Sequence, residues 1–188
     1  MDERTSTTTR NDTDQKLLAR VIGQDRDAFR ELYIAYHRRL SRFLLRLTKR
    51  HEVIEEVIND TLWIVWNQAA TFRNESQVST WIMGIAYRRT LKALRQHFPL
   101  SASNLTDIDD VPLAAPDLNA EEETQQWITH GLDQLPLEQR LVLEFAYDMG
   151  HSCEEIAAIM NCPVNTVKTR LFHARRKLRD ILPELAGL

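Results

Sequence analysis

Apolar residues recur every three or four positions through most of the chain, and this spacing predicts amphipathic helices. Four helices are expected in the first half: a short one near Asp14 to Ile22, one carrying Ala28 to Leu47, one from about Glu52 to Ala70, and one capped by Ser79 or Thr80. No run alternates apolar and polar residues convincingly. The pattern therefore predicts an all-α fold with little or no sheet.

The second half of the chain also has the signals that begin and end helices. Asn119 and Glu122 form a cap pair for a helix reaching about Leu135, and Pro136 suits the first turn of the next helix, which Gly150 ends. Ser152 to Glu155 has the sequence of a capping box that starts a short helix. Pro163 then suits the first turn of a last helix, expected to run to about Ile181.

The segment from Cys153 to Phe172 is predicted to form a helix-turn-helix. A small residue, Ala157, lets two helices approach closely, and Asn161 tolerates the left-handed backbone of a tight turn. Val167 on the inward face of the second helix would fix its orientation. This spacing is typical of DNA-binding proteins.

The outer face of that second helix carries long basic and short polar side chains, which suit entry into the major groove of DNA. The predicted DNA-binding residues are Asn165, Thr166, Lys168, Thr169, Arg170, His173 and Arg176. The alternative is a basic, solvated helix in a bundle. The turn, the capping box and the absence of acids from residues 163–179 together favour DNA binding.

Residues 99–119 have the composition of a linker, with Pro99, Pro112 and Pro116, several Ser, Asn and Asp residues, and no sustained helical period. The predicted organisation is a disordered tail over residues 1–13, a helical domain over 14–98, an acidic flexible linker over 99–119, and a second helical domain over 120–188. A linker of this length spans at most about 70 Å when fully extended.

The charge of the chain is divided along it. The net charge is only −3 overall, but residues 25–98 carry +5 and residues 99–123 carry −7. Residues 163–179 carry six basic side chains and no acidic one. Such asymmetry indicates contact with nucleic acid by the two basic zones and not by the acidic segment between them.

Other kinds of chemistry have weak signals. Two cysteines exclude a disulfide scaffold, and His151, Cys153 and Cys162 resemble half a metal site without a fourth ligand. No nucleophile elbow or Gly-rich phosphate loop is present, so neither a catalytic site nor a cofactor is expected. No apolar run is long enough for a membrane span and no signal peptide precedes the first helix, so a cytoplasmic location without membrane insertion is expected.

Four stretches of the chain carry a resemblance to the extracytoplasmic-function (ECF) sigma factors of bacterial RNA polymerase, the small class with only sigma regions two and four. The stretches are Asp27-Ala28-Phe29 through Tyr36, Ile54 through Trp66, Phe72 through Ala86, and Leu135-Pro136 through Leu171. Each stretch alone is only a modest indication of the family. All four in this order, with an acidic linker before the last, are specific to it.

The resemblance implies that the helix from Glu52 to Ala70 binds a coiled coil of core RNA polymerase. The residues on its polar face are Glu55, Glu56, Asn59, Asp60, Trp63 and Asn67. Without the resemblance, the same residues would be interpreted as a solvated helix face.

The resemblance also implies that the loop after Phe72 and the helix that follows it open and read the promoter −10 element. Trapping an unpaired base requires a polar pocket, and holding a single strand requires cations. The predicted residues are Arg73, Asn74, Ser76, Arg88, Arg89, Lys92 and Arg95. Trp81, Ile82, Ile85 and Ala86 are more typical of a core, and Tyr87 suits either role.

The chain departs from the family pattern at three positions. Arg88 and Lys92 stand where Asn and Asp are common, and Asn165 replaces a common Gly. The extra cations are expected to strengthen contacts with the DNA backbone at the expense of base discrimination.

The resemblance implies a dissociable initiation subunit with core RNA polymerase and promoter DNA as partners, and with control by an anti-sigma factor. In the family the linker occupies the RNA path of the polymerase, although a plain acidic spacer is an alternative. Two other classes remain open at this point: an ordinary DNA-binding regulator with a helical N-terminal domain, and a helical protein-interaction module. The first does not require the Glu55 to Trp66 helix, and the second leaves the cations of residues 163–179 unexplained.

Overall fold

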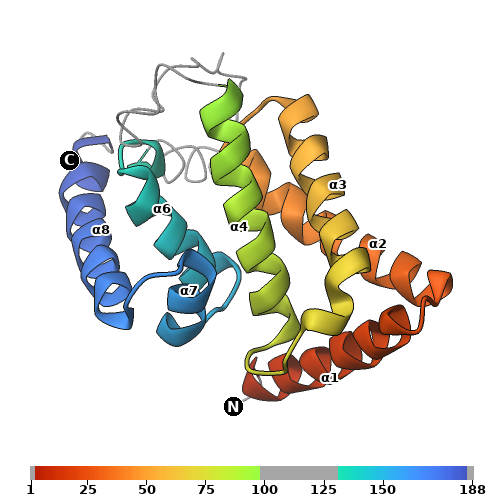
Figure 1. Cartoon of the computed structure of the whole chain (residues 1–188). Coiled ribbons are helices and arrows are strands. Elements are labelled where there is room, and N and C mark those ends of the chain that lie inside the picture. The colour runs from red at the N-terminus through yellow and green to blue at the C-terminus, as the bar shows by residue number, and fades with distance from the viewer. Residues whose placement is uncertain (1–2, 98–130, 186–188) are drawn as a thin grey trace, which may run out of the picture. The chain divides into compact units, whose positions relative to one another are not determined.

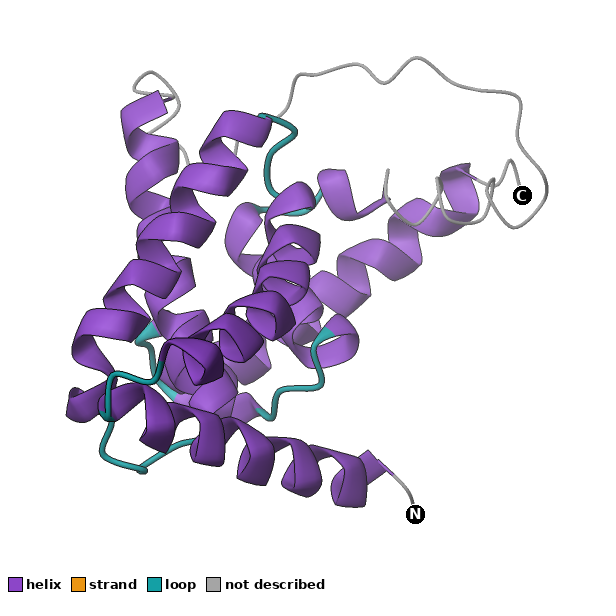
Figure 2. Ribbon diagram, turned by 90° about the vertical axis from the view of Figure 1, so that its right-hand side faces the viewer, coloured by secondary structure: helices purple, strands orange, loops and turns teal. Residues whose placement is uncertain are grey.

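The computed structural model describes residues 3–97 and 131–185, and within these ranges every regular element is a helix (Figure 1). Figure 2 shows the same helices joined by short loops, with no strand in the part of the chain described. The helices divide into two compact units, one containing α1 to α4 and one containing α6 and α8. The predicted all-α fold is confirmed.

The first unit is a bundle in which each of the four main helices packs against at least two others. Its elements are α1 (Glu3–Ile22), α2 (Arg26–Leu45), α3 (His51–Gln68), the short 3-10 helix η1 (Ala69–Thr71) and α4 (Val78–His97). α1 packs against α2, α2 against α3, α3 against α4, and α4 against α1. The four main helices therefore enclose a single apolar core.

That core is built from the apolar stripes that the sequence predicts. On α2 the buried side chains are Ala28, Leu32, Tyr36, Leu40, Phe43 and Leu44, at helical spacing. On α3 they include Val57, Ile58 and Leu62. The buried hydroxyls of Thr61 and Thr90 donate to the carbonyls four residues earlier, at 2.7 and 2.8 Å, so neither leaves an unsatisfied polar group.

The prediction of a disordered tail over residues 1–13 is wrong for most of that segment. α1 begins at Glu3, eleven residues before the expected start at Asp14. The sequence of this stretch is polar and rich in Thr, which favours disorder on composition alone. The tertiary contacts of Asn11 and Asp14, described below, supply what composition could not predict.

A buried hydrogen bond joins α1 to α2. The hydroxyl of Tyr36, which is fully buried, donates to Oδ2 of Asp14 at 2.6 Å. Asp14 is only 5% exposed, and a guanidinium nitrogen of Arg39 lies 3.8 Å from the same oxygen. Burial, followed by the negative charge of Asp14, raises the pKa of Tyr36 well above its usual value. The bond thus places a polar pair inside an otherwise apolar interface.

The second unit contains α6 (Leu137–Leu143), a π-helical segment (Glu144–Asp148), the first residues of α7 (Cys153–Met160) and α8 (Val164–Leu185). α6 packs against α8. Its core includes Leu141, Phe145, Ile156 and Val167, each at most 1% exposed. Lys177 of α8 also donates to the carbonyl of Gln134 at 2.5 Å.

Several predicted helix ends differ from the structure. α4 starts at Val78, so Ser79 and Thr80 lie inside its first turn and neither is the cap. Pro136 is the residue before α6 rather than part of it, and the π-helical segment replaces the last turn that was expected to be α-helical. α8 continues past Ile181 to Leu185. The linker over 99–119 and most of the helix expected from Asn119 to Leu135 lie outside the described residues.

The Asp14–Tyr36 bond yields a stability prediction. Tyr36→Phe removes the donor and leaves a buried carboxylate with a missing partner, so the free energy of unfolding should fall by about 1–3 kcal/mol. Chemical denaturation of the full chain, followed by far-UV circular dichroism, measures the loss.

Tyr33 offers the matched control on the same helix. Its hydroxyl donates to Oδ1 of Asn59 at 3.2 Å in an exposed bond. Tyr33→Phe should therefore change the unfolding free energy by no more than about 0.5 kcal/mol. Equal effects of the two substitutions would contradict the role given to the buried bond.

Candidate functional site

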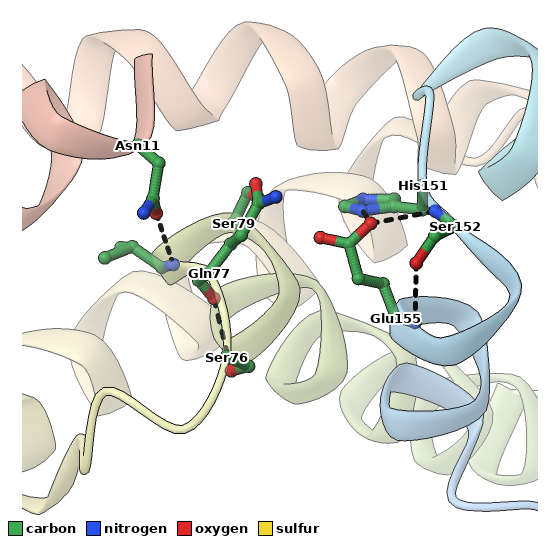
Figure 3. A network of polar contacts seen from close by, with 8 residues as sticks. Asn11, Ser76, Gln77, Ser79, His151, Ser152 and Glu155 are labelled. Carbon is green, nitrogen blue, oxygen red and sulfur yellow. Dashed lines mark hydrogen bonds and ion pairs between the residues drawn. The ribbon is translucent and has the colours of Figure 1, made fainter. Parts of the chain in front are cut away.

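The first helix of the helix-turn-helix is held at its start by a reciprocal pair of hydrogen bonds. The backbone N–H of Ser152 donates to Oε2 of Glu155 at 2.8 Å, and the N–H of Glu155 donates to Oγ of Ser152 at 3.2 Å (Figure 3). The predicted capping box is confirmed. Nδ1 of His151 lies 3.8 Å from the same Glu155 oxygen, and its ring contacts Phe145 edge-on at 6.1 Å.

These contacts perturb the Glu155 carboxyl. The side-chain contact with His151, aided by the backbone bond from Ser152 and opposed by burial, lowers the pKa of Glu155 from 4.5 to about 2. The carboxylate is therefore charged at neutral pH, as its role at the positive end of α7 requires.

The turn between α7 and α8 has the geometry that the sequence predicts. Asn161 has a φ of 51°, in the left-handed region. Ala157 is buried and Val167 is fully buried. α8 begins at Val164, two residues after Cys162. Because Val167 is buried, one face of α8 is fixed against its own unit and the opposite face is exposed.

Most of the predicted DNA-binding residues lie on that exposed face. Asn165, Lys168, Thr169, His173 and Arg176 are exposed, and Thr166 is half-buried at its edge. The face extends to Arg175, Lys177 and Arg179, so that it remains basic along the helix.

Arg170 differs from the rest of the set. It is half-buried, and its guanidinium forms a short ion pair with Glu138 of α6. A second guanidinium nitrogen lies 3.7 Å from Sγ of Cys162. Arg170 therefore has a structural role between α6 and α8, which the sequence did not predict because Glu138 is 32 residues away.

Sequence analysis missed an aromatic residue on the same face. Phe172 is 58% exposed and follows Lys168 by one helical turn, so the two side chains are neighbours on α8. Tyr147 of the π-helical segment is 68% exposed, and its hydroxyl lies 3.5 Å from a guanidinium nitrogen of Arg175. A helical projection of residues 164–179 would have identified Phe172 as the apolar member of a polar face.

In the first unit, the cations predicted to contact the −10 element follow α4. Arg88, Lys92 and Arg95 are exposed and stand four and three residues apart, so they form one stripe. The loop before α4 exposes Arg73 and Asn74, and Asn74 has a φ of 56°.

The apolar residues of α4 behave as the core interpretation expects. Ile82, Ile85, Ala86 and Tyr87 are buried. Trp81 is half-buried, with its ring 5.4 Å from that of Phe72 across the base of the loop.

The polar face of α3 is exposed as expected, opposite its buried stripe. Glu55, Glu56, Asn59 and Asn67 are exposed, and Trp63 is 66% exposed. A large aromatic side chain in the middle of a polar face is unusual for a merely solvated helix.

The α3 and α4 faces meet at an ion pair. A guanidinium nitrogen of Arg89 lies 3.6 Å from Oδ2 of Asp60, and both side chains are partly exposed. The residue predicted to bind polymerase and one predicted to bind DNA therefore contact each other.

Comparison with known proteins gives the family. Residues 32–97 match a family model described as Sigma-70 region 2, and residues 125–178 match one described as Sigma-70, region 4. ECF RNA polymerase sigma factor SigM of Mycobacterium tuberculosis is 32% identical over 171 residues, which cover 90% of this chain and 85% of that protein. This chain belongs to the ECF sigma factor family.

Other relatives of this sigma factor agree. The ECF RNA polymerase sigma-E factor of Escherichia coli is 29% identical over 177 residues, covering 88% of this chain and 92% of that protein. Two solved structures share its fold. The first is CnrH in complex with the cytosolic domain of CnrY, with a TM-score of 0.69 and 20% identity, covering 92% of this chain and 98% of that one. The second is RpoE in complex with the anti-sigma factor NepR from Bartonella quintana, with a TM-score of 0.63 and 22% identity, covering 82% of this chain and 96% of that one. The chain is therefore a transcription initiation factor that directs RNA polymerase to promoters, and the open alternative of an ordinary regulator falls away.

Within residues 3–97 and 131–185, no cluster of three or more His, Cys, Asp or Glu side chains could hold a metal ion. Of His151, Cys153 and Cys162, which resemble half a metal site in the sequence, His151 contacts Glu155, and Sγ of Cys162 lies 3.7 Å from a guanidinium nitrogen of Arg170. The helices of the same ranges also include none with the length and apolar character needed to cross a bilayer.

The lowered pKa of Glu155 predicts a pH dependence of stability. Because the folded pKa lies below the unfolded one, the contribution of the carboxylate is fully present above about pH 4.5 and is lost as the pH falls toward 2. Glu155→Gln should therefore flatten the fall in stability across this window, measured as the thermal unfolding midpoint of the full chain at each pH.

Glu154→Gln is the matched control, since Glu154 is the exposed neighbour in the same first turn. The thermal unfolding midpoint of Glu154→Gln should depend on pH in the same way as that of the wild type. A profile for Glu155→Gln that overlays the wild type would show that the capping carboxylate does not govern acid stability.

Proposed function

We propose that this sigma factor binds core RNA polymerase through the polar face of α3, reads the −35 element with α8, and melts and reads the −10 element with the loop of residues 72–77 and α4. In this proposal residues 14–98 and 120–188 are the two functional domains, and the acidic residues 99–119 connect them away from DNA. The protein acts in the cytoplasm, without catalytic chemistry of its own.

The observation that carries the proposal is the exposed face of α8. This face presents cations, the amide of Asn165 and the ring of Phe172. It lies on the second helix of a helix-turn-helix whose first helix is capped. In such motifs the first turns of the second helix contact base edges, and residues farther along contact phosphates. Phe172 adds an apolar surface of the kind that packs against a thymine methyl group.

The first unit supports the rest of the proposal by its charge. The stripe of Arg88, Lys92 and Arg95 on α4 suits a single-stranded backbone, and the exposed Asn74 and half-buried Ser76 offer polar groups beside it. On α3, the acidic side chains Glu55, Glu56 and Asp60 precede the exposed Trp63, which suits a partner surface that is basic next to an apolar contact.

Control by an anti-sigma factor is part of the proposal. The solved structures that share this fold include one with the anti-sigma factor NepR and one with the cytosolic domain of CnrY. An inhibitor that covers the α3 face or the α8 face would block polymerase or DNA, and both faces carry a large exposed aromatic side chain.

Promoter-directed transcription with purified core polymerase tests the function, and Asp60 provides the discriminating variant. The wild type should produce a defined transcript. Asp60→Lys places a positive charge on the α3 face and should reduce assembly with core polymerase at least tenfold, as expected when like charges meet at an interface. Competition with a labelled sigma factor for core polymerase measures the assembly.

The control is Arg89→Gln, which breaks the same Asp60–Arg89 pair from the α4 side. It should leave assembly with polymerase unchanged. Normal assembly of Asp60→Lys would contradict the α3 assignment, and a wild type that represses a promoter but yields no transcript would overturn the proposed function.

Arg170 yields a second prediction, because its two roles can be separated. Arg170→Ala should weaken binding of a duplex −35 element by about 1–3 kcal/mol, as Lys168→Ala should, if both side chains contact bases. Fluorescence anisotropy with labelled duplex, at one fixed salt concentration, measures the affinity.

Glu138→Gln is the control for the structural role, because it weakens the same ion pair and leaves the cation in place. It should lower stability like Arg170→Ala but keep or raise the affinity for DNA. If Glu138→Gln and Arg170→Ala lose affinity equally, Arg170 supports the fold and does not read DNA.

A further inference from the structure

A side chain from α1 holds the start of α4. The amide of Val78 is the first of α4 and has no acceptor inside its own helix. Oδ1 of Asn11 accepts a hydrogen bond from it at 3.1 Å, across 67 positions of sequence. Figure 3 shows Asn11 reaching from α1 to this amide, beside Ser76, Gln77 and Ser79. The segment that was expected to be a disordered tail thus caps a helix on which the proposed −10 contacts depend.

Asn11 is itself fixed by the buried bond between α1 and α2. It stands three residues before Asp14, so the two side chains lie on the same side of α1. Asp14 is bonded to Tyr36 at 2.6 Å and lies close to Arg39. α1 cannot slide or rotate without breaking this buried contact, and the position of the Asn11 amide group follows from it.

The loop before α4 is exposed over Arg73, Asn74 and Glu75. The other hydrogen bonds described for its end are local: Oγ of Ser76 donates to the carbonyl of Gln77 at 3.3 Å, and Oγ of Ser79 donates to Oε1 of Gln77 at 3.5 Å. The Phe72 and Trp81 rings close its base. Asn11 therefore supplies a long-range polar contact at the point where the loop ends and α4 begins.

We propose that Asn11 is a positioning residue for promoter melting: it holds the loop of residues 72–77 in the geometry that captures an unpaired −10 base, without touching DNA itself. The inference rests on the proposed function of this loop. A pocket for a flipped base must exist before the base arrives, because each ångström of disorder in the loop reduces the binding that offsets unstacking.

The test compares Asn11→Ala with Asn11→Asp in holoenzyme assembled from the full chain, on a promoter that the wild type leaves about half melted. Permanganate reactivity of the −10 thymines reports melting. Asn11→Ala should lower the ratio of melted to closed promoter about 2- to 30-fold, the range expected from the loss of a helix cap. Asn11→Asp keeps an acceptor at the positive end of α4 and should restore melting to within about twofold of the wild type.

The Asn11→Asp variant separates positioning from direct contact. If residue 11 touched the DNA strand, the new carboxylate would repel the phosphates, and Asn11→Asp would melt less promoter than Asn11→Ala. That outcome would overturn the proposal, as would wild-type melting by Asn11→Ala. Assembly with core polymerase and binding of −35 duplex should be unchanged in both variants. An equal loss of assembly would show that Asn11 serves only general stability.

Asp12→Ala is the control in the same turn of α1, because Asp12 is exposed and lies about 100° around the helix from Asn11. It should melt promoter like the wild type. The proposal fails if Asp12→Ala impairs melting as much as Asn11→Ala. A wild-type holoenzyme that assembles and melts no promoter at all would instead overturn the function proposed for the loop, and this inference with it.

Discussion

Backbone amides at the start of a helix have no acceptor within that helix, and this constraint organises both units of the protein. Asp25 satisfies it for α2 by accepting from the amides of Asp27 and Ala28 at 2.9 and 3.1 Å. These amides and the guanidinium of Arg20 lower the pKa of Asp25. Ser152 satisfies the same constraint for α7, and Asn11 for α4. Of the two elements proposed to contact DNA, α4 thus begins where a polar side chain fixes its first turn, and α8 follows a helix that is fixed in the same way.

Two partly exposed ion pairs lie outside the apolar cores, and each can be broken at low cost. Arg89 is paired with Asp60 and Arg170 with Glu138, each across two neighbouring helices of one unit. An ion pair with this much exposure is worth at most about 1 kcal/mol, so a DNA phosphate or a protein partner competes for either member at little cost. Under the proposed function, each pair would hold its arginine near the surface that contacts DNA until a partner replaces the carboxylate.

Periodicity in the sequence predicts the helices and their buried faces because burial of an apolar stripe is a local property of the helix. The buried positions of α2 and α3, the capping box at Ser152 and the left-handed Asn161 were all predictable in this way. Contacts between residues distant in sequence were not. The helix that replaces the expected tail, the cap at Val78 and the partner of Arg170 each depend on a residue on another helix, to which no local pattern points.

The π-helical turn at Glu144–Asp148 has a consequence for how the length of the chain can vary. Such a turn holds one residue more than an α-helical turn does, and here it forms the last turn of the helix that begins with α6, just before Gly150. Removal of one residue elsewhere in a helix rotates everything beyond it by about 100°, which would bring polar side chains into the core. Because the π-helical turn is the last turn before Gly150, the deletion of one residue near Tyr147 would leave the buried positions of α6 in phase. A deletion inside α2 or α3 would instead rotate the part of the buried stripe that follows it, so these helices tolerate substitution and not a change of length.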